Sequence, residues 1–357
     1  MKKFGLFLAV AAVFALAGEA FAARSIKAGF IYSGPIGDHG WTYQHDQGRL
    51  ALEKELGAKT IYIENVKDRD QAAVEQAIKR LANSGCELIF ATSFGFMNPT
   101  VRLAKQFERV KFEHVAGYKR GSNVSVYAGR FYEGRAVIGT IAGKMTKTDK
   151  IGYIASFPIP EVIRGIDAFT LAARRVNPKA VVKVVWLNTW HNPSMEGDAA
   201  KKLIRQGCDI LAQQTDSAEP LKAAEEAGVH GFGHALDMSS YAPKAQLTAI
   251  VDDWGNYYIS RAKAVMDGTW KTSDSWQGLK SGMVQIAPYG PAVPKEVRKL
   301  ADEVKNSIID GTFHPFQGPI KNQAGELVVK EGETLSDSEM LGLTWYVEGV
   351  EGSIPKK

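Results

Sequence analysis

Short apolar runs alternate with longer amphipathic segments along most of this chain. The apolar runs predict buried strands, and apolar positions three or four residues apart predict helices. Strands are expected at 26–32, 59–63, 88–92, 111–115 and 124–128, then at 151–155, 181–186, 210–213, 230–235 and 249–251. Helices are expected at 42–56, 70–84, 99–107, 160–175, 195–206 and 219–227. This alternation is typical of an α/β protein with parallel sheets covered by helices on both faces.

The second half of this pattern repeats the first. Segments 27–36 and 150–159 share lysine, glycine, an aromatic residue, isoleucine, proline and isoleucine in register, at an offset of 123 residues. Cys86 and Cys208 follow at an offset of 122, each after a helix and a glycine. We therefore expect two doubly wound lobes joined by a hinge, at 23–130 and 131–250. The remaining 251–357 should supply the hinge return, late strands and C-terminal elements packed on both lobes.

Cys86 and Cys208 are the only cysteines. Equivalent positions in separate lobes lie too far apart for a disulfide, whose Cα atoms must be within about 7 Å. We therefore predict two buried free thiols.

The first residues have the pattern of a secretory signal peptide, at 1–22. Lys2 and Lys3 precede an apolar run at 4–18, and Ala20 and Ala22 form an A-x-A-like exit. The run is shorter than the roughly 20 residues a membrane span needs. The alternative is a buried N-terminal helix. We expect a periplasmic protein with no lipid anchor, because no cysteine lies near the cleavage site.

Charge argues against one class of partner. The net charge of +5 is spread along the chain without a basic tract, so a nucleic-acid ligand is not expected.

Ligands of open α/β sheets bind beyond the carboxyl ends of the strands. Aromatic rings, carboxylates and small polar residues follow the predicted strands there, a combination that suits a nucleobase, a nucleoside or a sugar. The alternative is that some rings belong to the core, and that Asp216 and Asp237 are helix caps or turn residues. The expected ligand-binding residues are Asp38, Trp41, Ser93, Phe94, Trp190, Thr215, Asp216, Asp237 and Trp254.

Several of these segments resemble the basic membrane protein family, the substrate-binding proteins of ABC transporters. The resembling segments are 37–41, 90–96, 143–152 and 233–237. The resemblance implies a type 1 periplasmic binding protein fold, a purine ligand captured by lobe closure and an ABC transporter permease as partner. It places the base-stacking ring at Trp41, where the family often has phenylalanine, and a ribose contact near Asp237.

One departure bears on the ligand. Nucleoside-binding members tend to have a lysine where this chain has 252–254, two aspartates and Trp254. The resemblance therefore favours a free base such as adenine slightly over a nucleoside.

The sequence leaves three alternative functions. A sugar or signalling-molecule binding protein has the same fold, and a transcription regulator would need DNA-binding helices where the leader lies. A purine-processing enzyme is disfavoured because the chain has no Gly-x-Ser-x-Gly elbow, no Gly-x-Gly-x-x-Gly after a strand and no phosphate loop. His230 and His234 fall in one predicted strand, about 13 Å apart along the chain, so a metal site formed by both is not expected. No cofactor is expected.

The C-terminal segments are expected to be structural. A surface helix is predicted within 290–311 and a hairpin within 316–325. Ser336 and Glu339 have the spacing of a capping box.

Overall fold

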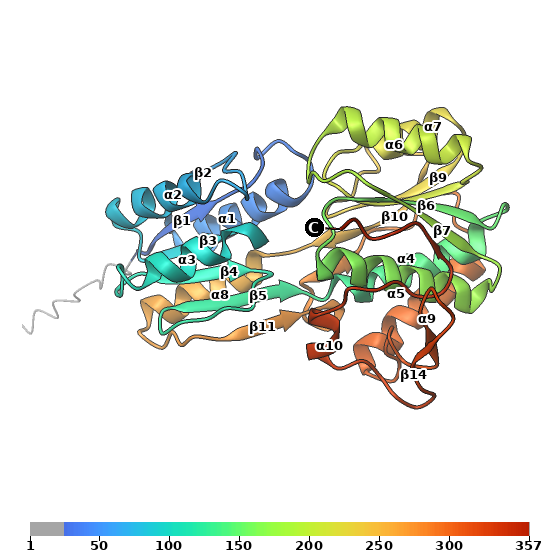
Figure 1. Ribbon diagram of the computed structural model, residues 1–357. Coiled ribbons are helices and arrows are strands. Elements are labelled where there is room, and N and C mark those ends of the chain that lie inside the picture. The colour runs from blue at the N-terminus through green and yellow to red at the C-terminus, as the bar shows by residue number, and fades with distance from the viewer. Residues whose placement is uncertain (1–24, 357) are drawn as a thin grey trace, which may run out of the picture.

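Two α/β lobes lie side by side in the computed structural model, which describes residues 25–356 (Figure 1). The predicted leader lies outside these residues. The first sheet has the order β11-β5-β4-β3-β1-β2 and the second the order β12-β10-β9-β8-β6-β7-β15. Apart from β15, the two orders correspond strand for strand, which confirms that the sequence repeat is a structural repeat.

Every strand pair of the first sheet is parallel, as predicted. Helices cover both faces because the strands are apolar on both sides. The strands are β1 (Lys27–Ile31), β2 (Lys59–Ile63), β3 (Leu88–Ala91), β4 (Lys111–Val115), β5 (Val124–Gly129) and β11 (Asp274–Gln277). The helices are α1 (Trp41–Leu56), α2 (Gln71–Asn83), the short η1 (Phe94–Phe96), α3 (Met97–Ala104) and α8 (Gly255–Met266).

The second sheet is parallel except where β12 runs antiparallel to β10. Its strands are β6 (Lys150–Ala155), β7 (Val181–Trp186), β8 (Ile210–Gln214), β9 (His230–Gly233), β10 (Gln246–Asp252), β12 (Val284–Ile286) and β15 (Val350–Glu351). Its helices are α4 (Phe131–Met145), α5 (Pro160–Val176), α6 (Pro193–Arg205), α7 (Glu219–Glu226), α9 (Lys295–Asp310) and α10 (Asp337–Leu341), with η2 (Leu279–Ser281) and the hairpin β13 (Ile320–Lys321) and β14 (Leu327–Val329).

The chain passes between the sheets three times. It crosses from β5 to α4, returns from β10 to α8, and crosses again from β11 to β12. The first crossing follows the end of β5 at Gly129, and the second follows the end of β10 at Asp252. The third crossing is needed because residues 255–277 return to the first lobe. The sequence pattern of that segment did not indicate this return.

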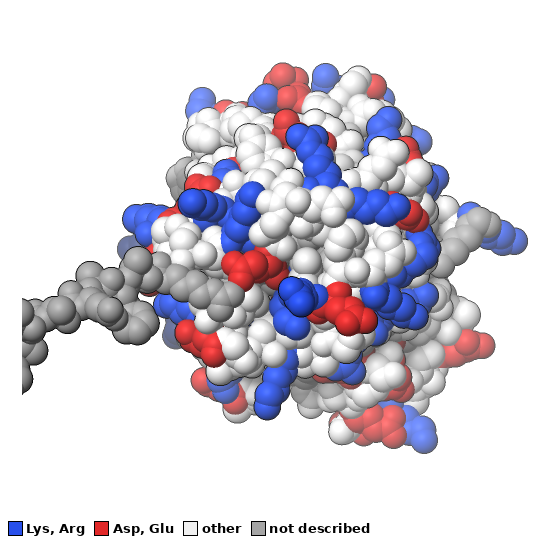
Figure 2. All heavy atoms as spheres, turned by 90° about the vertical axis from the view of Figure 1, so that its left-hand side faces the viewer, with Lys and Arg blue, Asp and Glu red and all other residues white. Residues whose placement is uncertain are grey.

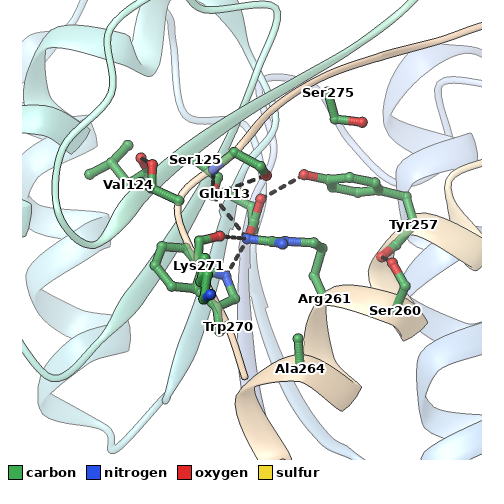
Figure 3. A network of polar contacts seen from close by, with 12 residues as sticks. Glu113, Val124, Ser125, Tyr257, Ser260, Arg261, Ala264, Trp270, Lys271 and Ser275 are labelled. Carbon is green, nitrogen blue, oxygen red and sulfur yellow. Dashed lines mark hydrogen bonds and ion pairs between the residues drawn. The ribbon is translucent and has the colours of Figure 1, made fainter. Parts of the chain in front are cut away.

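A buried carboxylate attaches the returning segment to the first lobe (Figure 3). Glu113 on β4 accepts hydrogen bonds from the Tyr257 hydroxyl at 2.7 Å, the Arg261 Nε at 2.6 Å and the Trp270 Nε1 at 2.7 Å. Arg261 also donates to the Ser125 hydroxyl on β5 at 2.9 Å. Burying a carboxylate is costly unless it is paired, and here three donors compensate it.

Both cysteines are free and buried, as predicted. Burial raises the pKa of each thiol to about 11. At neutral pH they are therefore protonated apolar residues of the two lobe cores.

Helix α4 is the largest element that the sequence pattern does not predict. Most of its residues are buried, because it packs against α5 and α9 and lies close to β10. A helix that is apolar on nearly every side has no polar stripe for the pattern to reveal.

Candidate functional site

The largest set of predicted ligand-binding residues comes together in a pocket between the lobes. It has an empty volume of about 480 Å³. The residues that line it are Ser33, Trp41, Ser93, Phe94, Ala116, Phe131, Ile159, Glu161, Trp190, Gln214, Asp216 and His234. Nearly all of them follow closely on the carboxyl end of a strand, which is where open parallel sheets bind ligands.

Trp41 is held in place by a hydrogen bond within its own lobe and by rings near the two crossings. Its indole Nε1 donates to the Thr92 carbonyl at 2.7 Å. The ring meets Phe131 edge to face at 6.0 Å between centroids, and Trp254 at 5.4 Å. A ring fixed in this way is preorganised, so little conformational entropy is lost when a ligand packs on it.

Trp190 enters the pocket from the second lobe and is bonded to the first. Its Nε1 donates to Asp68 Oδ2 at 3.0 Å, and its ring meets Phe157 edge to face at 5.1 Å. The Arg69 guanidinium lies 5.1 Å from the centre of the same Phe157 ring. Because these contacts join side chains of both lobes, the structure shows the lobes closed on each other.

The Asp216 carboxylate of the second lobe contacts the first lobe. Its Oδ1 accepts a hydrogen bond from the Trp41 backbone N–H, at the start of α1, at 3.2 Å. Burial, together with the nearby Asp38 carboxylate, raises the pKa of Asp216 well above its usual value. A neutral carboxyl group here has both a donor and an acceptor to offer a ligand.

The approach of Asp216 to α1 requires a glycine at position 40. A Cβ on Gly40 would lie 2.6 Å from the Asp216 Cβ and 2.7 Å from its backbone oxygen. By contrast, a Cβ on Gly37 in the same loop would meet nothing within 4 Å. Gly40 is therefore needed for the lobes to come this close.

A hydrogen-bonded polar cluster of the second lobe reaches the pocket through Glu161, Gln214 and His234. Arg135 donates to the Gln213 carbonyl at 2.9 Å and to His234 Nδ1 at 3.0 Å. Burial and the Arg135 charge hold the pKa of His234 well below its usual value. Since guanidinium can only donate, His234 is neutral with its proton on Nε2. His234 can then donate a hydrogen bond to a ligand from Nε2.

Glu161 completes this cluster. It accepts from Gln214 Nε2 at 3.4 Å, while Gln214 Oε1 accepts from the Tyr153 hydroxyl at 3.2 Å. Burial raises the pKa of Glu161, and the Arg164 and Arg135 charges oppose that rise. Glu161 and Asp216 thus both lie in the pocket with a raised affinity for protons.

Five of the nine residues predicted from the sequence line this pocket: Trp41, Ser93, Phe94, Trp190 and Asp216. The other four are placed elsewhere. Asp38 accepts from the backbone N–H groups of residues 40, 42 and 43, so its carboxylate caps α1. Asp237 accepts from the Ser239 N–H and from Gln246, as in a turn.

Thr215 and Trp254 are buried behind the pocket rather than in its wall. The Thr215 hydroxyl has no hydrogen-bond partner within residues 25–356. The Trp254 ring stacks on the His45 imidazole at 4.4 Å and supports Trp41 from behind.

Sequence reasoning missed seven lining residues: Ser33, Ala116, Phe131, Ile159, Glu161, Gln214 and His234. The strand-end rule, applied to every predicted strand, would have included Ser33, Ala116 and Gln214, each of which directly follows a predicted strand. Phe131 lies just past the end of β5 and falls under the same rule. Glu161 carries no such signal, because it lies on α5, which begins after a loop.

Two further findings concern residues 25–356. No helix in this part of the chain is both long and apolar enough to cross a membrane. Within the same residues, no three His, Cys, Asp or Glu side chains are grouped to hold a metal ion.

On the face of the first lobe shown in Figure 2, basic and acidic side chains are interspersed.

The family model and two similar proteins have names that refer to the binding of small molecules. Residues 25–314 match the Bmp family model, described as ABC transporter substrate-binding protein PnrA-like. A purine-binding protein of Brucella abortus is 51% identical over 98% of this chain and 99% of its own length. A Haloferax volcanii protein, named as a putative ABC transporter glucose-binding protein, is 33% identical over 93% of this chain and 82% of its own.

Solved structures agree on the fold. A solute-binding protein of an ABC transporter system from Aeropyrum pernix superposes with a TM-score of 0.71 at 18% identity, covering 83% of this chain and 93% of that one. A second, from Conexibacter woesei, gives 0.68 at 20% identity, covering 81% and 98%. The architecture is that of the type 1 periplasmic binding proteins, and the family consists of solute-binding proteins rather than enzymes. This chain belongs to the Bmp family of ABC transporter substrate-binding proteins.

Proposed function

We propose that this protein binds a purine in the interlobe pocket and presents it to an ABC transporter permease, with the free base preferred over the nucleoside. The observation that carries the proposal is the pocket itself. Trp41 and Phe94 of the first lobe and Trp190 of the second line the same space as Asp216, Glu161 and His234.

The polar groups fit the edge of a purine. A purine edge alternates ring nitrogens that accept hydrogen bonds with N–H groups that donate them. A neutral carboxyl group on Asp216 or Glu161 can donate and accept at once, and His234 Nε2 adds a donor. The indole rings supply flat apolar surface, and stacking a base on an aromatic ring contributes about 1–3 kcal/mol.

Lobe closure supplies the capture step. The closed arrangement is held by direct bonds between the lobes, including Trp190 to Asp68, Trp41 to Asp216 and Gln44 Nε2 to the Ala235 carbonyl at 2.8 Å. A ligand that touches both lobes adds contacts available only in this state, so it shifts the population toward closure.

A sugar is the second candidate ligand. The relative named for glucose binding supports it, and aromatic rings beside carboxylates also suit sugars. Isothermal titration calorimetry with adenine, adenosine, glucose and ribose separates the two. We expect adenine to bind most tightly; glucose or ribose binding in preference to both purines would overturn the proposal.

We further propose that the protein acts in the periplasm after removal of residues 1–22. The support is the charged, apolar and small-residue sequence of those positions, which lie outside the described residues. N-terminal sequencing of the exported protein should begin at Ala23, and an uncleaved Met1 would contradict it.

A further inference from the structure

A second chamber adjoins the interlobe pocket. Its empty volume is about 1080 Å³, which includes the part that opens toward solvent. Phe94, Ala116, Ile159 and Glu161 line both spaces. The two spaces therefore meet at these four side chains.

The C-terminal segment forms one wall of this chamber. Ser338, Leu341 and Gly342, in and just after α10, face it. Figure 1 shows α10 below the second lobe, beside the ends of β5 and β11. This wall lies beyond residues 25–314, the part of the chain that matches the family model.

Two arginines fix α10 there. Arg130, at the first crossing, makes two bonds to the Asp337 carboxylate, at 2.8 and 2.6 Å. Arg164 on α5 donates to the Met340 carbonyl at 2.6 Å. The wall is thus held by charge-assisted hydrogen bonds at both ends of the short helix.

The chamber is mainly apolar, with one buried cation. Phe94, Tyr127, Ile159, Trp276 and Leu341 contribute ring and aliphatic surface. Arg164 is buried, and its guanidinium lies 4.8 Å from the centre of the Trp276 ring.

A hydroxyl-rich group such as ribose needs partners for most of its oxygens. The Trp276 indole N–H is already bonded to the Gly129 carbonyl. Apart from it and the Tyr118 and Tyr127 phenols, four lining side chains can hydrogen-bond: Glu161, Arg164, Asp274 and Ser338. An apolar group that carries a single acceptor fits these walls better.

We propose that this chamber is a second subsite, which accepts a mainly apolar substituent of a purine whose ring occupies the first pocket. A hydrogen-bond acceptor at the far end of such a substituent would meet Arg164. This inference rests on the proposed function, because it takes the ring in the first pocket to be a purine.

Calorimetry with four probes tests it: adenine, adenosine, 6-benzylaminopurine and 9-benzyladenine. Two benzyl isomers are needed because the orientation of the ring decides which substituent points into the chamber. We expect at least one isomer to bind about tenfold more tightly than adenine, because burying the phenyl ring is favourable. The gain should exceed any gain shown by adenosine.

A filling variant assigns the gain to this chamber. Ser338→Tyr should remove the gain of the benzyl compound and leave adenine affinity unchanged; Leu341→Trp is a second filling variant on the same exposed helix. Lys330→Tyr, an exposed position of the same C-terminal segment outside the chamber, is the matched control and should keep the gain.

The outcomes separate the two proposals. Failure of adenine to bind overturns the proposed function. Adenine binding with both benzyl isomers weaker than adenine, with adenosine gaining more than either, or with a gain that survives both filling variants, overturns only the second subsite.

Discussion

The Trp190 indole donates a hydrogen bond of 3.0 Å to the Asp68 carboxylate across the cleft, so a ring that lines the pocket also joins the two lobes. Burial raises the pKa of Asp68, and the bonds from Ser93 and Trp190 oppose that rise. Ligand contact and lobe closure therefore depend on the same side chain.

Replacing Asp68 tests this coupling. Asp68→Ala should weaken ligand binding about 10- to 150-fold, the effect of losing about 1.5–3 kcal/mol for a hydrogen bond to a charged group. Asp68→Asn keeps an acceptor oxygen and should lose less. Calorimetry gives the affinities, and small-angle scattering gives the closed fraction. Equal affinity for Asp68→Ala and wild type would show that the bond does not contribute to closure.

Gly40 gives a sharper test of closure. In Gly40→Ala the new Cβ would lie 2.6 Å from the Asp216 Cβ, closer than real Cβ contacts allow, so the lobes cannot come fully together. We expect affinity to fall by at least about tenfold, since ligand would have to bind a more open form. Gly37→Ala in the same loop meets nothing within 4 Å and is the control. Matching losses in both variants would mean that loop flexibility matters rather than contact with Asp216.

Trp41 should contribute to both binding and stability. Trp41→Ala removes a stacking surface worth about 1–3 kcal/mol, or about 5- to 150-fold in affinity. It also lowers the melting temperature, because the ring supports Phe131 and Trp254.

Trp41→Phe retains a ring but loses the bond to the Thr92 carbonyl, and should keep most of the affinity. Trp186→Ala, a half-buried tryptophan that donates to Tyr346 away from the pocket, controls for lost stability. If Trp41→Ala loses no more affinity than Trp186→Ala, Trp41 is not a stacking ring.

Asp216 should make the stability of the ligand-free protein depend on pH. Its pKa is raised in the folded state, so folding takes up a proton. Its contribution is fully present below the unfolded value of 3.8 and is lost as pH rises toward the folded pKa.

Asp216→Asn should remove that loss and raise the melting temperature at neutral pH relative to wild type. Its amide oxygen can still accept from Trp41. Scanning calorimetry from pH 4 to pH 8 measures the slope, with the exposed Asp310→Asn as control. A wild-type slope that persists in Asp216→Asn would assign the effect to other carboxyls, such as Glu161 or Asp252.

The sequence by itself determined the architecture. Strands such as 59–63, 111–115 and 181–186 have the predicted bounds, because short apolar runs between turn residues are a local signal. The offset of 122–123 residues predicted two lobes of one topology, and the sheets have that topology. The cysteines follow from the same repeat.

Only the tertiary structure decided which strand-end residues face the ligand. Asp38 and Asp216 both follow a strand, yet Asp38 caps its own helix while Asp216 reaches across to the other lobe. Local sequence does not distinguish these roles, because the difference lies in a contact between residues 175 positions apart.

The second chamber depends on the same kind of contact. Its walls come from both lobes and from α10, and no periodicity along the chain records which of three distant segments will meet. Secondary structure and internal repeats can be recognised from the order of residues along the chain. A cleft depends on which surfaces pack together, and that is decided only when the chain folds.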